Sequence, residues 1–185
     1  METTPDAGQN IITRGLPKTG QVTQYRAGDD GQYEAGWWRG RLNANNRDRF
    51  IIRTIIVNGG VDVVLDRATG LMWPRDLTAA GANNGNLTQW NPAIDWALAL
   101  DFAGFTDWRL PNILELFSLA TQAGAAPLIW GVFQNCRTGT PYWSSTTLPL
   151  TTDEAWTVNF ATGGNIVGAP KGIASQYMIA VRKGI

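Results

Sequence analysis

The sequence predicts an α+β domain at residues 49–185, carried on an extended N-terminal arm at residues 1–48. Strand-like runs of β-branched or alternating residues lie toward both ends of the domain, and two stretches with apolar residues at helical spacing lie between them. The composition allows a packed core, because 44% of the residues are hydrophobic and 9 are tryptophan. We therefore expect two helices that flank a twisted antiparallel sheet.

The arm is rich in glycine, and its apolar residues show little periodicity, which is typical of an extended segment. We expect it to be an assembly segment, because burial against a partner must offset the entropy lost when it is ordered. Aromatic residues and arginine are enriched at protein interfaces. The arm carries such a group at Trp37, Trp38, Arg39 and Arg41, and the basic run continues to Arg49 and Arg53. A patch of this kind can also bind single-stranded nucleic acid, but charges spread along an extended segment favour a solvated face or a contact between subunits.

Two adjacent carboxylates, Asp29 and Asp30, lie between glycines in the arm. Asp-Gly is a plain turn signal, whereas paired carboxylates also occur in calcium sites. The full spacing of an EF-hand calcium loop is missing from the sequence. We therefore favour a turn and predict no metal, and calcium at this pair stays as the alternative.

The domain begins with three predicted strands, at residues 49–57, 61–65 and 71–73. The turn residues Asn58-Gly59-Gly60 join the first two strands, which predicts a hairpin. Residues 66–70 turn the chain into the third strand, and Pro74 ends it. A polar loop is expected over residues 76–89.

Two helices follow this loop. In the first, we expect Asn91 to be the N-cap and Pro92 to be the first helical residue. The second is expected over residues 113–120, with Asn112 as its N-cap. Glu115 lies three residues after Asn112, which is the spacing of a capping box.

A strand-like corner precedes the second helix. Trp108 and Leu110 alternate with Asp107 and Arg109, so the two charged side chains are expected on one face, near enough for an ion pair. We interpret the corner as structural. The alternative is a catalytic role for Asp107, Arg109 and Glu115.

The C-terminal third carries three further predicted strands, at residues 142–147, 155–160 and 176–182, with a short pairing strand at 165–167. The alternation of Trp156 and Val158 with Thr157 predicts a sheet with one buried face. The intervening segments 147–153 and 162–176 are polar or rich in glycine, as binding loops on a rigid scaffold often are. The candidate ligand-binding residues in them are Asp153, Glu154, Asn165 and Lys171. These loops could equally only connect strands or contact a sister subunit.

Five short motifs occur in a fixed order: Thr69–Trp73, Asp107–Pro111 with Glu115, Tyr142–Thr146, Ala155-Trp156 with Asn159-Phe160, and Val181-Arg182. As a set, they resemble the DUF1566 or Lcl C-terminal domain family, over about residues 49–185. The domains of this family look like variants of the C-type lectin fold, so the resemblance implies a C-type lectin-like scaffold. It also implies that the tryptophans of these motifs are buried near one core: Trp73, Trp108, Trp143 and Trp156. The tripeptides typical of calcium-dependent sugar binding are absent, so the resemblance does not imply that activity.

Composition disfavours several classes of function. The formal net charge is +0, so no global attraction to nucleic acid or to an anionic membrane is expected, and no apolar run is long enough to insert into a bilayer. The chain has 0 histidines and 1 cysteine, which removes the commonest general base and any intrachain disulfide. We expect no catalytic residues and no cofactor.

These observations predict a non-enzymatic structural or binding protein of an extracellular assembly. The first expectation is a phage virion component, such as a capsid decoration or a tail or fibre protein, that forms a homo-oligomer or contacts other virion proteins through its arm. Residues 1–6 lack the basic and apolar regions of a signal peptide, which suits a virion protein better than a secreted one. The alternative is an adhesin on the bacterial cell surface that binds glycans.

Overall fold

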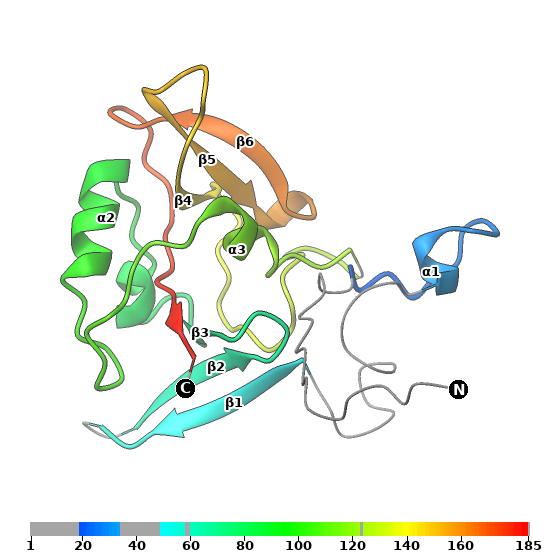
Figure 1. Cartoon of the computed structure of the whole chain (residues 1–185), viewed down its shortest axis with the longest axis horizontal. Coiled ribbons are helices and arrows are strands. Elements are labelled where there is room, and N and C mark those ends of the chain that lie inside the picture. The colour runs from blue at the N-terminus through cyan, green and yellow to red at the C-terminus, as the bar shows by residue number, and fades with distance from the viewer. Residues whose placement is uncertain (1–18, 34–48, 58–59, 123, 185) are drawn as a thin grey trace, which may run out of the picture.

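The computed structural model describes residues 19–33, 49–57, 60–122 and 124–184. The predicted α+β class is confirmed, but the described strands form two antiparallel sheets rather than one (Figure 1). One sheet has the strand order β1-β2-β3-β7, and the other has the order β4-β5-β6. The predicted interface residues of the arm lie outside the described residues: Trp37, Trp38, Arg39 and Arg41.

The first sheet contains the predicted hairpin. Its strands are β1 (Phe50–Ile55), β2 (Val61–Asp66), β3 (Leu71–Pro74) and β7 (Arg182–Lys183). The hairpin pairs Phe50 with Asp66 at its open end and Ile55 with Val61 near its turn. Because Met72 on β3 pairs with Arg182 on β7, the sheet joins the two ends of the domain.

The predicted strand over residues 176–182 is wrong for all but its last residue. The chain there crosses from the second sheet to the first and pairs once with each segment it passes. Gln176 pairs with Thr88, Tyr177 with Tyr142, and Val181 with Arg109. Met178 to Val181 are buried, so the apolar pattern reflects burial on all sides rather than membership of one sheet.

The second sheet consists of β4 (Tyr142–Thr147), β5 (Glu154–Asn159) and β6 (Asn165–Pro170). β6 is longer than predicted and pairs with the whole of β5. The prediction of one buried face is wrong, because β5 packs on both sides. Val158 belongs to one core cluster and Ala155 to another, while Thr157 is buried and donates a hydrogen bond to the Val167 carbonyl.

Helix α2 (Trp90–Leu98) begins two residues earlier than expected, with Gln89 rather than Asn91 at its N-cap. Pro92 is then the third helical residue, where a missing N–H costs no helical hydrogen bond. Helix α3 (Ile113–Phe117) has the predicted capping box. It ends at Phe117 and is shorter than predicted, because the buried Ala120 pairs with Ile129 instead of continuing the helix.

Short helices complete the described elements: α1 (Asp30–Tyr33) in the arm, and the 3-10 helices η1 (Ala80–Gly85) and η2 (Phe160–Thr162). Residues 76–89 were expected to form only a loop, and η1 lies within them. None of the helices in the described segments has the length and apolar character needed to cross a lipid bilayer.

The tryptophans do not share one core. Trp73, Trp108 and Trp143 are fully buried, but each belongs to a different core cluster of the described residues. Two sheets and the intervening helices create several packing interfaces, and each interface takes its own tryptophan. Trp156 is only partly buried and is not named in any of these clusters, so the expectation that is wrong is the single shared core.

The predicted ion pair between Asp107 and Arg109 is also wrong. Arg109 instead forms a two-bonded pair with Glu115, at 2.6 and 2.7 Å. Asp107 pairs with Arg182, 75 residues away in the sequence, at 2.6 and 3.1 Å. The alternation did place Trp108 and Leu110 in the core, but the C-terminal crossing supplied Asp107 with a partner that the local pattern did not contain.

Candidate binding surfaces

One candidate surface lies at the end of the second sheet, where the β4–β5 connection meets the chain after β6. We call it the loop surface and define it as Trp90, residues 147–153 and residues 171–173. The Lys171 N–H donates to the Asp153 carbonyl at 2.9 Å, and the Gln89 amide donates to the Gly172 carbonyl at 2.6 Å. The start of α2 and both loops are therefore tied together.

Lys171 is the centre of the loop surface. Its ammonium group lies 4.1 Å from the centroid of the Trp90 ring, which is a cation–π contact. The same group donates hydrogen bonds to the Thr147 hydroxyl at 2.8 Å and the Thr152 carbonyl at 2.9 Å. These contacts fix the side chain, so a cation is held in place over the face of an aromatic ring.

Exposed apolar side chains flank this cation. Leu150, at the tip of the β4–β5 connection, is 99% exposed, and Ile173 is also strongly exposed. Loop residues of this kind were not predicted from the sequence, because single apolar residues in a loop carry no periodicity. Trp90 was missed for another reason, since its position before a helix gave no sign of the lysine that packs on it.

The four predicted ligand-binding residues do not all meet. Asp153, Glu154 and Lys171 lie together, because Glu154 pairs with Pro170 at the end of β6 that leads into Lys171. Asn165 begins β6 and pairs with Asn159, so it lies at the opposite end of the strand, about 17 Å away for five residues of extended chain. The Glu154 carboxylate lies over Gly168, where an added Cβ would come within 2.5 Å of its oxygen.

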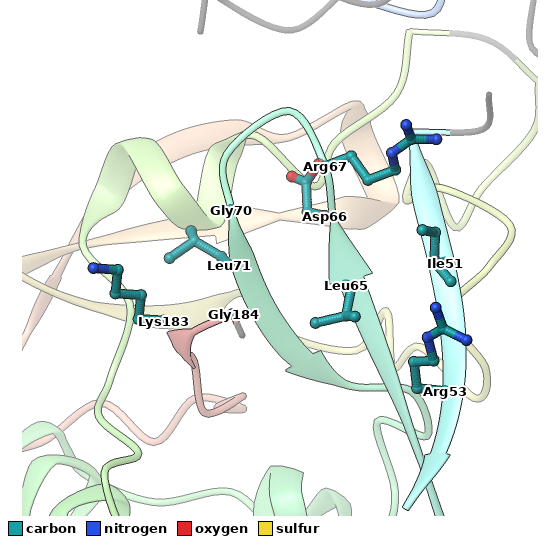
Figure 2. Close-up of a pocket in the computed structure, with 9 residues that line it drawn as sticks. All are labelled: Ile51, Arg53, Leu65, Asp66, Arg67, Gly70, Leu71, Lys183 and Gly184. Carbon is teal, nitrogen blue, oxygen red and sulfur yellow. The ribbon is translucent and has the colours of Figure 1, made fainter. Parts of the chain in front are cut away.

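A second candidate surface is an open hollow of about 560 Å³ on the first sheet, which we call the basic hollow (Figure 2). Its cations come from separate elements, Arg53 on β1, Arg67 in the β2–β3 turn and Lys183 on β7. Figure 2 shows Lys183 and Arg53 on opposite sides of the hollow, with Leu65 between them. The hollow thus combines spaced positive charges with an apolar floor.

Among the described residues that line the basic hollow, the carboxylate of Asp66 is already engaged in a structural contact. Asp66 and Arg49 form a fully buried pair, with nitrogen–oxygen distances of 2.7 and 2.9 Å. Asp66 also accepts bonds from the Ala68 N–H and the Thr69 hydroxyl, so it organises the β2–β3 turn. Arg49 is therefore a structural residue, and the expectation that the basic run is solvated is wrong for it.

The described part of the arm touches the domain at its start. The Gln122 N–H donates to the Thr19 carbonyl at 3.0 Å. Gly20 has a φ of +90° and lies so close to Trp130 that an added Cβ would come within 3.0 Å of its ring. Glycine at this position therefore allows the close approach. Beyond it, Figure 1 shows α1 set well apart from both sheets.

Asp29 acts as a turn residue. Its carboxylate accepts hydrogen bonds from the Tyr25 and Arg26 N–H groups, at 2.8 and 3.1 Å, and from the Gln32 N–H at 3.2 Å. The bond from Tyr25 holds the pKa of Asp29 below its ordinary value, against the opposing effect of burial. Asp30 bonds instead to the Thr19 hydroxyl. The bonds that Asp29 accepts have the geometry of a turn. Within the described residues, no group of three or more potential metal-ligating side chains comes together.

The residues weighed for catalysis are engaged in structural contacts. Asp107 and Glu115 belong to separate ion pairs. Cys136 lies 3.7 Å from the Tyr142 hydroxyl, and burial raises the pKa of its thiol to about 11. The thiol is therefore protonated at neutral pH, which makes it a weak nucleophile. Burial likewise raises the pKa of Tyr142.

Comparison with known proteins places these features in a family. Residues 62–182, more than half of the chain, match the Lcl C-terminal domain. No curated protein matches the chain. No solved structure matches it either.

Proposed function

Since the chain belongs to the Lcl C-terminal domain family, we propose that it is a non-enzymatic structural and binding component of an extracellular assembly, in the first place a phage particle. In this proposal the arm contacts neighbouring subunits or other virion proteins, and the Lcl domain presents a surface to a host ligand. The observation that supports it most is the apolar, projecting part of the arm. Tyr25 is 82% exposed and Tyr33 is 68% exposed.

The projecting segment has its own internal structure, which favours a role in contacts. The hydrogen bonds of Tyr25 and Gln32 stay inside the segment and close it around Asp29. A preformed turn loses less entropy on binding than a disordered arm does. Two tyrosines held on such a turn supply large contact areas at low conformational cost.

The test is a pair of tyrosine substitutions in the full-length chain. Tyr25→Ala with Tyr33→Ala should shift native mass spectra toward smaller species, because the exposed rings are proposed to lie in the subunit contact. Leu150→Ala is the matched control, since it removes a strongly exposed apolar group from the loop surface. A full-length chain that is monomeric at micromolar concentration would refute the assembly role.

We also propose that the domain is C-type lectin-like, as the family resemblance implies. Two features support this finer assignment. The β3–β7 pairing brings the ends of the domain together, and the β4–β5 connection meets the chain after β6 at one end of the second sheet. An experimental structure that superposes on C-type lectin domains over both sheets would test it, and a different strand order would refute it.

The second candidate function is a cell-surface adhesin, and the two surfaces favour it. The basic hollow suits a ligand with carboxylate, sulfate or phosphate groups, because its cations are spaced around an open floor. The loop surface suits a neutral sugar or a protein, because a fixed lysine and Trp90 lie beside exposed apolar tips. Binding to a glycan array, with and without calcium, tests this function.

Substitutions separate the two surfaces in that experiment. Arg53→Ala with Lys183→Ala should abolish binding of acidic glycans only, whereas Lys171→Ala should affect ligands of the loop surface only. The third cation, Arg67, is left in place so that the β2–β3 turn is not disturbed. An array without any positive signal would count heavily against the adhesin function.

A further inference from the structure

Strand β1 forms an edge of the first sheet within the described part of the chain. It pairs with β2 over the whole length of both strands, from Phe50 with Asp66 to Ile55 with Val61, without a register shift. Its other edge faces away from β2 (Figure 1). An unbroken edge strand presents a row of backbone donors and acceptors to any other strand.

The register identifies these outward groups. The Arg67 N–H donates to the Arg49 carbonyl at 2.8 Å, so residues 49 and 67 form a hydrogen-bonded pair. Hydrogen-bonded pairs alternate along an antiparallel ladder, so Ile51, Arg53 and Ile55 direct their backbone groups toward β2. Phe50, Ile52 and Thr54 therefore direct their N–H and carbonyl groups outward.

The devices that usually protect an edge strand are nearly missing from β1. Its sequence, Phe-Ile-Ile-Arg-Thr-Ile, contains no proline and one charge. The Ile52 side chain is 42% exposed, and the Ile56 side chain just beyond the strand is 84% exposed. A strand that is β-branched, apolar and open is predicted to pair with another strand.

We propose that β1 pairs with the β1 strand of a second copy of this chain, antiparallel and about a two-fold axis. A two-fold contact uses the same surface on both copies, so the outward backbone groups of one β1 strand can hydrogen-bond to those of the other. The paired sheets would form one continuous sheet across the two molecules. This contact goes beyond the proposed role of the arm, because it uses the backbone of the domain itself.

Charge and hydrogen bonding fix the register. The outward N–H and carbonyl groups of one copy must meet those of the other copy. The hydrogen-bonded pairs between the two β1 strands can therefore involve only Phe50, Ile52 and Thr54. A register centred on Arg53 would place two arginines directly opposite, which is destabilising. A register centred on Ile52 avoids this, because each Arg53 then lies opposite Ile51. It also places the two exposed Ile52 side chains against each other.

Cysteine cross-linking tests this register in the full-length chain, with Cys136→Ser to remove the native thiol. Ile52→Cys places two thiols on a hydrogen-bonded pair, where Cα atoms are about 5.5 Å apart and a disulfide can form. Mild oxidation should therefore convert Ile52→Cys largely to a dimer on a non-reducing gel. Arg53→Cys and Thr54→Cys are the matched controls and should form several-fold less dimer. Equal cross-linking at all three positions, or none at Ile52→Cys, would overturn the proposal.

A second variant tests the contact without cross-linking. Ile52→Lys should weaken association by about tenfold or more, because two like charges would face each other across the new ladder. Ile173→Lys places the same charge on an exposed isoleucine of the loop surface and should leave association unchanged. Sedimentation equilibrium measures both, and circular dichroism confirms that each variant is folded. The same association constant for the two variants would also contradict a β1 contact.

Discussion

Among single residues, Arg49 and Asp66 make the most sensitive contact in the first sheet. Both side chains are fully buried, and the guanidinium lies 2.7 Å from the carboxylate. Asp66→Asn would remove the negative charge from one member of this fully buried pair, so we expect the free energy of unfolding to fall by about 3–5 kcal/mol. Urea unfolding of the purified variant measures this loss.

Asp107→Asn is the control for this prediction. Asp107 pairs with Arg182 at a similar distance, but the side chain of Asp107 is 58% exposed. Water already screens that pair, so its loss should cost about 0–1 kcal/mol. Equal losses for the two variants would mean that burial does not set the strength of the Arg49–Asp66 pair.

Glu115 should make stability depend on pH. Burial raises the pKa of its carboxyl, but hydrogen bonds from Arg109 and from the Asn112 N–H outweigh burial and hold the pKa below 4.5. A lowered pKa in the folded state stabilises the fold above the unfolded value, and this stabilisation is lost as the pH falls below about 4.5. Glu115→Gln should therefore lose about 1.5 kcal/mol at pH 7 and show a smaller decline than the parent toward pH 3.

The comparison is made as the difference between the two unfolding curves at each pH, because other carboxylates with lowered pKa values, such as Asp62, titrate in both proteins. A difference that stays constant from pH 7 to pH 3 would contradict the role of the Glu115 charge.

Residue-level prediction from sequence worked where the partners are local. The capping box joins Asn112 to Glu115, three residues apart, and the pattern alone predicted it. Arg49 and Asp66 lie 17 residues apart across a hairpin, and no local pattern reports that both are buried. The same limit explains why Asp107 was paired with its neighbour rather than with Arg182.

At the scale of elements, the tryptophan before α3 and the tryptophan on β5 differ in burial. Trp108 is fully buried, and its indole N–H donates to the Phe102 carbonyl at 3.0 Å. Trp108→Ala should therefore cost about 3–5 kcal/mol. Trp156 lies half-buried on β5, so Trp156→Ala should cost only about 1–2 kcal/mol. Thermal unfolding monitored by circular dichroism should rank the two, and an equal loss would show that Trp156 is buried in solution.

Strands with a local partner were predictable, and strands with a distant partner were not. The hairpin of β1 and β2 followed from its turn and from its β-branched residues. The division into two sheets depends on which distant strands pair, and alternation within one strand carries no information on that choice. For this reason β7 was predicted too long, and β5 was assigned a single buried face.

On the scale of the whole molecule, the candidate site was only partly predictable. Asp153 and Lys171 could be placed together, since they lie in loops that follow predicted strands. The length of β6 decides that Asn165 lies elsewhere, and the sequence indicated only a short strand there. The basic hollow could not be predicted, because its cations come from residues 53, 67 and 183.

The arrangement of the chain ends leads to a last prediction. Deleting residues 1–40 removes the Thr19–Gln122 hydrogen bond and the Gly20 contact with Trp130, but it leaves Arg49 and both sheets intact. We expect the deletion to lower the free energy of unfolding by about 1 kcal/mol, which should lower the melting temperature by about 2–4 °C. Assembly should be reduced, because the exposed tyrosines of the arm are removed with it. Calorimetry and native mass spectrometry measure the two effects separately.

Deleting residues 178–185 is the contrasting experiment, because that segment carries the buried Met178 to Val181 and the β7 strand that pairs with β3. These residues are buried where the chain crosses from the second sheet to the first. This variant should fail to fold, with a loss of the cooperative thermal transition. If the shorter N-terminal deletion also abolished the transition, the arm would be part of the folding unit, and its loss could no longer be used to test assembly.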